Sequence, residues 1–226
     1  MIVLGIDTAT WTATAGVVRD GEVLGEGVYR EERSHTRSLT QLVDRVLGDA
    51  GLAIGDVDAL AVSIGPGSFT GLRVGLALAK GIAFAGGLPI AAIPTLEALA
   101  WVADAAPGDA VCAALDARKQ EVYAALFTMT SDGPRRETPD EALAPAALAE
   151  RLRPGSILVG DAGDVYGAVL GARAVLRPFT THHPRGSVVA RLGWQRLRAG
   201  AAEPIGPLEP VYVRPPDAEL PRTGSR

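Results

Sequence analysis

The stretch IVLGIDTATWTATAGVV at residues 2–18 decides the fold class, because it joins a buried strand to a hairpin through a turn that opens on an aspartate. Its first part, IVLGID, is a continuous apolar run that ends at Asp7, the pattern of a buried strand. WTATAGVV alternates in part, the Asp-Gly of residues 19–22 turns the chain, and 23–30 return, which predicts a β-hairpin. A Rossmann fold is disfavoured, since it would place a helix directly after the first strand.

The same pattern returns in the second half of the chain. AVCAALD at 110–116 is again an apolar run that ends on an aspartate, Asp116, and EVYAALF at 121–127 alternates back as its hairpin partner. Two similar α/β halves, each with an aspartate at its first turn, predict a pseudo-symmetric protein of two lobes with a cleft between them.

The remaining elements are expected from apolar periodicity and turn residues. Thr95 is a plausible N-cap for the third of the expected helices. Helices are predicted over the apolar stripe from Leu39 to the stop at Gly51 and over residues 70–85, 95–105, 144–152 and 187–200. Further strands are predicted at 57–64, 88–93, 156–161 and 174–178.

Composition indicates an ordinary globular protein: of 226 residues 47% are hydrophobic and 21% are charged, and the mean hydropathy is +0.18. No apolar run reaches the roughly 18 residues of a membrane span without charge or glycine, so no membrane association is expected. The N-terminus has no basic leader, and we expect a mature cytoplasmic protein. The net charge of −4 and the scattered cations disfavour independent binding to nucleic acid. The lone Cys112 is expected to be buried and inert.

SIGPGSFTGLRVG at 63–75 is a glycine-rich turn that opens a helix, so its N–H groups and the helix dipole are available to an anion. The spacing of a P-loop or of a nucleophile elbow is absent. We therefore favour a structural role, in which the turn is sharp and Gly71 and Gly75 allow another helix to approach closely. The helix-start turn comprises Gly65, Pro66 and Gly67, with Ser68 or Thr70 as the cap.

Three aspartates each end a predicted strand and can line one cleft, which is consistent with nucleotide handling. The DTAT turn can surround a phosphate while its aspartate holds a metal ion or water, or it can be a plain Asx turn. The second turn, with two cations, can meet an anion or be solvated. No metal site is predicted from the three histidines, His35, His182 and His183. The candidate cleft residues are Asp7, Thr8, Asp116, Arg118 and Asp161.

Five stretches together resemble the TsaB (YeaZ) family, in order and spacing, over essentially the whole chain. They are DTAT, SIGPGSFTGLRVGLALAKGIA, IPTLEALA, DARKQEVYAALF and PVYVRPPDAE. Residues 129–187 carry the least of the resemblance. It implies an α/β, two-lobed actin/sugar-kinase/Hsp70-like (ASKHA) fold, in agreement with the repeated strand–Asp–hairpin pattern.

The resemblance also implies a function. TsaB-like proteins are non-catalytic, dimerising partners of TsaD, and they work with TsaD and the ATPase TsaE. TsaD transfers a threonylcarbamoyl group to N6 of adenosine 37 in tRNAs that read ANN codons. It implies no intrinsic cofactor, ATP or ADP at the interface of the complex, tRNA contact only through the complex, and a homodimer when the chain is alone. TsaD-like chains have an HxxxH metal pair where this chain has Thr95 and Leu99, which cannot replace imidazoles. Ala117 and Arg118 stand where a nucleotide-binding relative uses glycines.

In this family the two early helices form the subunit interface, as a four-helix bundle with the partner. The interface positions carried over are Leu39, Leu42, Val46, Phe69, Arg73 and Leu76. The expected organisation is an N-terminal lobe with the interface helices (1–104), a smaller second lobe (105–186), a C-terminal helix and strand packed on the lobes (187–213) and a flexible tail (214–226).

Two other functions compete with this interpretation. The three strand-end aspartates would also suit a stand-alone ATP-binding phosphotransferase or ATPase of the same superfamily. A protease or other hydrolase is disfavoured, because the metal pair and the nucleophile elbow are both missing.

Overall fold

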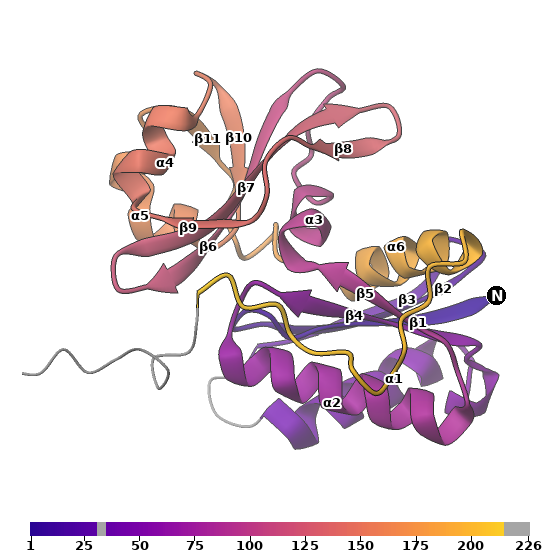
Figure 1. Ribbon diagram of the computed structural model, residues 1–226. Coiled ribbons are helices and arrows are strands. Elements are labelled where there is room, and N and C mark those ends of the chain that lie inside the picture. The colour runs from indigo at the N-terminus through magenta and orange to yellow at the C-terminus, as the bar shows by residue number, and fades with distance from the viewer. Residues whose placement is uncertain (31–34, 215–226) are drawn as a thin grey trace, which may run out of the picture.

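The computed structural model describes residues 1–30 and 35–214, and of residues 35–38 only the backbone. The chain forms two lobes, each built on one β-sheet (Figure 1). The tail predicted at 214–226 lies outside the described residues except for Arg214, and the side chain of His35 also lies outside them. The two-lobed α/β fold predicted from the repeated pattern is confirmed.

The first sheet has the strand order β3-β2-β1-β4-β5. Its central strand pairs antiparallel with the hairpin strand β2 and parallel with β4. The next strand pair, β2 with β3, is antiparallel across the Asp-Gly turn, so the predicted N-terminal hairpin is confirmed. The strands are β1 (Ile2–Asp7), β2 (Ala13–Arg19), β3 (Glu22–Tyr29), β4 (Ala59–Gly65) and β5 (Ile90–Pro94).

The second sheet repeats this arrangement in the order β11-β10-β6-β7-β8, with β9 beside β7. Here β6 takes the place of β1, because it pairs antiparallel with its hairpin partner β7 and parallel with β10. The strands are β6 (Ala110–Arg118), β7 (Glu121–Thr130), β8 (Gly133–Arg136), β9 (Glu141–Leu143), β10 (Ser156–Val159) and β11 (Ala174–Leu176).

The helices cover both faces of both sheets. In Figure 1, α1 (His35–Asp49) and α2 (Phe69–Gly86) lie beneath the first sheet, and α3 (Thr95–Ala100) and α6 (Gly186–Arg198) lie between the two sheets. The outer face of the second sheet carries α4 (Pro145–Arg151) and α5 (Ala162–Leu170). A short 3-10 helix, η1 (Ile54–Asp56), precedes β4.

Three local expectations are corrected. Helix α3 ends at Ala100, and Pro94 occupies its N-cap position; the Thr95 hydroxyl instead accepts a hydrogen bond from the Gly65 N–H at 3.1 Å. Helix α5 and strands β8 and β9 were not expected. The predicted C-terminal strand is absent from the described part of residues 199–213, where only an isolated bridge joins Glu203 to Ile90.

The C-terminal segment, residues 203–214, lies along α2 (Figure 1). The Lys80 ammonium donates hydrogen bonds to the carbonyls of Gly206 and Leu208, both at 3.0 Å. The Val211 N–H donates to the Ile64 carbonyl at 2.7 Å. These backbone bonds hold the irregular segment in place together with apolar packing, because Leu208 is buried in the core of the first lobe and Ile205 packs against that core.

Helix α2 is long and apolar enough to cross a membrane by length and composition alone. In this fold it lies on the first sheet and buries only 33% of its residues there. Its two charged side chains, Arg73 and Lys80, bond the C-terminal segment. The helix therefore leaves much apolar surface that the rest of the described chain does not cover.

The start of α2 is locked to the first turn of the chain. Ser68 is the N-cap, and its Oγ accepts from the Gly71 N–H at 3.2 Å, as the sequence predicts. The small face formed by Gly71 and Gly75 contacts Thr8 rather than another helix, which corrects the expected helix approach. A Cβ on Gly71 would lie 2.0 Å from the Thr8 carbonyl oxygen, and one on Gly75 would lie 2.2 Å from Thr8 Oγ1.

We expect Gly71→Ala to lower the free energy of unfolding by about 2 kcal/mol or more, because the added methyl group meets backbone that cannot move aside. Gly81→Ala is the matched control on the same helix: nothing lies within 4 Å of its Cβ position, and alanine there should stabilise by about 0.5–1 kcal/mol. Urea denaturation measures both. Equal effects of the two substitutions would contradict the proposed packing.

Candidate functional site

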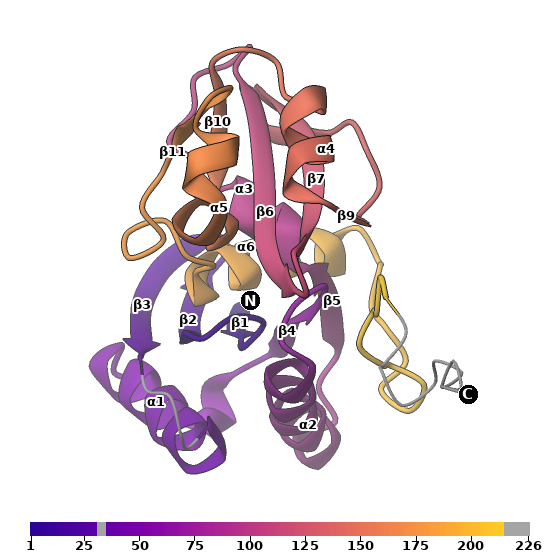
Figure 2. The same ribbon diagram turned by 90° about the vertical axis from the view of Figure 1, so that its left-hand side faces the viewer.

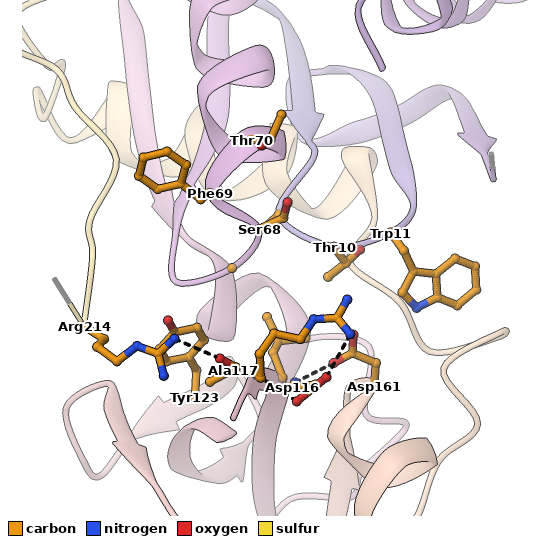
Figure 3. A pocket seen from close by; sticks show the side chains of 14 residues that line it. Thr10, Trp11, Ser68, Phe69, Thr70, Asp116, Ala117, Tyr123, Asp161 and Arg214 are labelled. Atoms are coloured by element: carbon orange, nitrogen blue, oxygen red, sulfur yellow. Dashed lines mark hydrogen bonds and ion pairs between the residues drawn. The ribbon is translucent and has the colours of Figure 1, made fainter. Parts of the chain in front are cut away.

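The largest described cavity lies between the lobes and has a volume of about 680 Å³. It is walled by the β1–β2 turn and the start of α2 on one side, and by β6, β7 and the start of α5 on the other (Figure 3). Its lining residues are Ala9, Thr10, Trp11, Gly67, Ser68, Phe69, Thr70, Leu115, Asp116, Ala117, Arg118, Tyr123, Asp161 and Arg214.

Three of the five predicted cleft residues, Asp116, Arg118 and Asp161, line this cavity. The other two do not, because Asp7 and Thr8 are buried behind it. The Thr8 hydroxyl donates to the Gly71 carbonyl at 2.7 Å, so it is engaged in holding α2. The expectation that all five line one cleft is thus corrected.

Asp7 is completely buried at the end of β1. Its Oδ1 accepts from the Ala9 N–H at 3.1 Å, which is the Asx turn considered as the plain interpretation. Neither its Oδ2 nor the Ser63 hydroxyl has a hydrogen-bond partner that meets normal geometry among the described residues. Burial raises the pKa of Asp7 to about 6, although the nearby Ser63 hydroxyl and the Ala9 N–H act in the opposite direction.

The second turn gathers its polar groups around two carboxylates. The Asp116 N–H donates to Asp161 Oδ1 at 2.8 Å, and the Tyr166 hydroxyl donates to Asp116 Oδ1 at 3.1 Å. Burial raises the pKa of Asp161 to about 6; the bond from the Asp116 N–H lowers it, and the Asp116 charge raises it. Arg118 lies 3.5 Å from Asp116 Oδ2 but has an 86% exposed side chain, so this ion pair contributes little.

The turn itself has an uncommon backbone. Arg118, Lys119 and Gln120 all have positive φ, at 62°, 52° and 62°, although none is glycine. Such residues cost of order 1 kcal/mol each and persist where the surroundings hold them. The turn therefore adopts a left-handed conformation although it contains no glycine. Its side chains occupy the space in which a glycine loop would expose backbone N–H groups.

Several residues of the cavity were not predicted to line it, among them Trp11, Tyr123 and Arg214, and also Phe69, which was assigned from the sequence to the partner interface. Trp11 lies at one side of it, and Phe69, Tyr123 and Arg214 lie toward the other (Figure 3). Arg214 Nη1 forms an ion pair with Glu121 Oε2 at 2.7 Å, across 93 residues of sequence. The only sequence signal for Arg214 was its place in the PVYVRPPDAE stretch.

A second, apolar groove of about 430 Å³ lies between α1 and α2, which run side by side beneath the first sheet in Figure 2. Six of its residues come from α2 and two from α1. Phe69 and Thr70 line both this groove and the cavity between the lobes. The lining residues are Leu39, Thr40, Phe69, Thr70, Arg73, Val74, Ala77 and Leu78.

The predicted interface residues fall into two groups. Phe69 and Arg73 are exposed, whereas the other four are at most 5% exposed and pack inside the lobe's own core. Charged substitutions at those four would therefore disturb the core rather than the surface. The buried members are Leu39, Leu42, Val46 and Leu76.

Arg73 is already engaged within the chain. Its guanidinium lies 3.6 Å from the centre of the Phe69 ring, and its Nε donates to the Tyr212 hydroxyl at 3.0 Å. The rings of Phe69 and Tyr212 are 5.2 Å apart. This cluster ties the C-terminal segment to the start of α2 and fixes the wall that the cavity and the groove share.

No group of three or more potential metal ligands of the His, Cys, Asp and Glu types converges among the described residues. His182 lies 3.1 Å from Asp104, and His183 is buried apart from it. Cys112 is completely buried, and burial raises the pKa of its thiol to about 12, in agreement with the expected inert thiol.

Comparison with known proteins agrees with this fold. Residues 22–157, more than half of the chain, match the family described as TsaD, tRNA N6-adenosine threonylcarbamoyltransferase. The Escherichia coli tRNA threonylcarbamoyladenosine biosynthesis protein TsaB is 32% identical over 95% of this chain and 95% of its own length.

Among solved structures, YeaZ from Pseudomonas aeruginosa superposes with a TM-score of 0.82 at 27% identity, covering 93% of this chain and 99% of that one. Component A of (R)-2-hydroxyglutaryl-CoA dehydratase from Acidaminococcus fermentans gives a TM-score of 0.52 at 11% identity, covering 88% of this chain and 99% of that one. The second likeness shows the fold alone.

We expect Asp7→Asn to flatten the pH dependence of stability. The folded-state pKa of about 6 lies above the ordinary aspartate pKa of 3.8, so charging Asp7 disfavours the folded state, and stability is lost as the pH rises through about 6. The amide can still accept from Ala9. The variant should gain up to about 3 kcal/mol over the wild type between pH 4 and pH 8.

Urea denaturation near pH 4 and near pH 8 measures this difference in the free energy of unfolding. The part of the pH dependence that comes from Asp161 should remain in the variant. Asp49→Asn, at the exposed end of α1, is the control for removing an exposed carboxylate. A wild-type profile in Asp7→Asn would contradict the assignment.

Proposed function

The chain belongs to the TsaB (YeaZ) family of tRNA threonylcarbamoyladenosine biosynthesis proteins, and from this premise we propose that it is the non-catalytic dimerisation subunit of a threonylcarbamoyltransferase. In this proposal it binds and activates a TsaD-like catalytic chain that modifies N6 of adenosine 37 in tRNAs reading ANN codons. A TsaE-like ATPase completes the set of partners, and tRNA is contacted only through the complex.

The observation that carries the proposal is the uncovered apolar side of α2. A helix of 18 residues that buries a third of them, beside an apolar groove of about 430 Å³, has the surface of a subunit interface. The exposed groove residues are the part that a partner helix would contact. The four buried interface candidates pack beneath these exposed residues and offer little surface to a partner. They are Leu39, Leu42, Val46 and Leu76.

Two further features support a non-catalytic role. Thr95 and Leu99 are both completely buried, and the Thr95 hydroxyl is used to hold the Gly65 N–H. Asp7, the aspartate of the DTAT turn that was considered as a metal or water ligand, is buried behind the cavity rather than lining it. The proposal therefore gives the chain no cofactor of its own and assigns ATP or ADP to the interface of the complex.

The function is tested by reconstitution. With a TsaD-like subunit, a TsaE-like ATPase, threonylcarbamoyl-adenylate and tRNA, we expect modification only when this chain is added. The chain alone should not bind ATP at micromolar concentrations. Micromolar ATP binding by the isolated chain would instead favour the stand-alone phosphotransferase.

We expect Ala77→Arg to abolish partner capture and modification, because Ala77 is an exposed residue of the groove and a charge there must be desolvated on binding. Ala85→Arg is the matched control, since Ala85 is exposed on the same helix outside the groove. Both variants should unfold at the wild-type temperature.

Sedimentation of the isolated chain gives a second readout. The wild type and Ala85→Arg should sediment as homodimers, and Ala77→Arg as a monomer. Undiminished capture of the TsaD-like subunit by Ala77→Arg would rule out this groove as the interface.

A further inference from the structure

The C-terminal segment is held in two unequal parts. Residues 203–208 are anchored to the first lobe, through Leu208 in its core and the two hydrogen bonds from the Lys80 ammonium. Residues 211–214, the distal end, include no buried residue. A stretch that is held by a few partly exposed contacts is the kind that opens locally while the surrounding fold stays intact.

The distal end touches the end of β4 and the start of α2. The Val211 N–H donates to the Ile64 carbonyl at 2.7 Å. The Val211 backbone also passes close over Gly65, where a Cβ would lie 2.5 Å from the Val211 carbonyl oxygen. The next residue, Tyr212, accepts the hydrogen bond from Arg73 Nε at 3.0 Å. On the first lobe, the distal end is therefore held by one backbone bond and one side-chain cluster.

Arg214 ties the same distal end to the second lobe. Its Nη1 forms an ion pair with Glu121 Oε2 at 2.7 Å, and its Nη2 donates to the Ala117 carbonyl at 3.4 Å (Figure 3). The Arg214 and Glu121 side chains are 25% and 38% exposed, so solvent screens the ion pair and leaves it of moderate strength. Arg214 follows Tyr212 by two residues, and the distal end thus bridges the start of α2 and the second lobe.

The first-lobe side of this bridge belongs to the wall of the α1–α2 groove. Phe69 and Arg73 both line the groove, and both are exposed. The Arg73 guanidinium lies 3.6 Å from the centre of the Phe69 ring, and the ring of Tyr212 lies 5.2 Å from that of Phe69. A partner bound in the groove would contact Phe69 and Arg73 and would restrict their motion. Because Tyr212 packs against both side chains, its motion would be restricted as well.

We propose that the distal end, residues 211–214, is a latch that couples the α1–α2 groove to the second lobe. In the latched state Arg214 is paired with Glu121, and Phe69 and Arg73 are held in one arrangement. A partner loses less conformational entropy when it binds this arrangement, and by reciprocity a bound partner stabilises the ion pair. The latch is a property of the isolated chain, whereas the part that the partner plays in it rests on the proposed function.

Hydrogen exchange of the Val211 amide, followed by NMR on the full chain without a partner, tests the latch. Glu121→Gln should lower the protection of this amide about two- to fivefold, the effect of removing one partly exposed ion pair. Glu141→Gln is the matched control and should leave the protection unchanged. Its ion pair with Arg151 is also 2.7 Å long and its side chain is also 38% exposed, but both residues belong to the second lobe.

Arg214→Gln removes the other half of the ion pair and should lower the protection of the Val211 amide at least as much as Glu121→Gln. Adding Glu121→Gln to Arg214→Gln should change little more, because the pair is already broken. Thermal melts should show that all these variants are folded. Unchanged protection of Val211 in both single variants would overturn the latch, since the contacts of the distal end would then open independently.

The coupling to the groove is tested with the TsaD-like subunit. Glu121 lines neither the groove nor the cavity between the lobes, yet Glu121→Gln should weaken binding of this subunit about two- to fivefold. Glu141→Gln should bind it like the wild type. Lower protection of Val211 together with unchanged affinity in Glu121→Gln would overturn the coupling. Undiminished capture by Ala77→Arg would instead count against the proposed function, and the exchange measurement, made without a partner, decides the latch by itself.

Discussion

The close packing of the first turn against the start of α2 is the constraint on which the rest of the first lobe depends. The Thr8 hydroxyl bonds the Gly71 carbonyl, and the Ser68 N–H bonds the Ala9 carbonyl at 2.7 Å. This contact is possible only where α2 has no Cβ, at Gly71 and Gly75. It fixes the angle at which α2 leaves the sheet, and with it both the cavity between the lobes and the groove beside α1.

One consequence is that the two surfaces share a wall. Phe69 and Thr70 line both the cavity and the groove, and Arg73 clamps Phe69 against Tyr212 of the C-terminal segment. Two residues further on, Arg214 closes the cavity by pairing with Glu121 of the second lobe. A partner bound in the groove would therefore contact residues that also line the cavity. Binding at the proposed interface could in this way change the shape of the cavity between the lobes.

Burial also raises the pKa of two of the aspartates that follow the strands. Asp7 lies behind the cavity with a raised pKa, and Asp161 is tied to the Asp116 backbone. A carboxylate that is desolvated in this way is costly to ionise, and Asp7 in addition does not line the cavity.

The sequence by itself determined the repeated strand–Asp–hairpin halves, a capping hydroxyl at either Ser68 or Thr70 and the buried Cys112, because periodicity, capping and apolar runs are local properties. It did not determine which face of α2 is free. The apolar stripe from Leu39 to Leu47 and the leucines of α2 have the same composition whether they face a core or a partner, and only the sheet above them decided that Leu42 and Leu76 are core. Nor could local patterns place Arg214 beside Glu121 or Ser187 beside Glu26, since those hydrogen-bonded pairs are 93 and 161 residues apart in the sequence. The tertiary structure decided these because they depend on how the two lobes and the C-terminal segment close on one another.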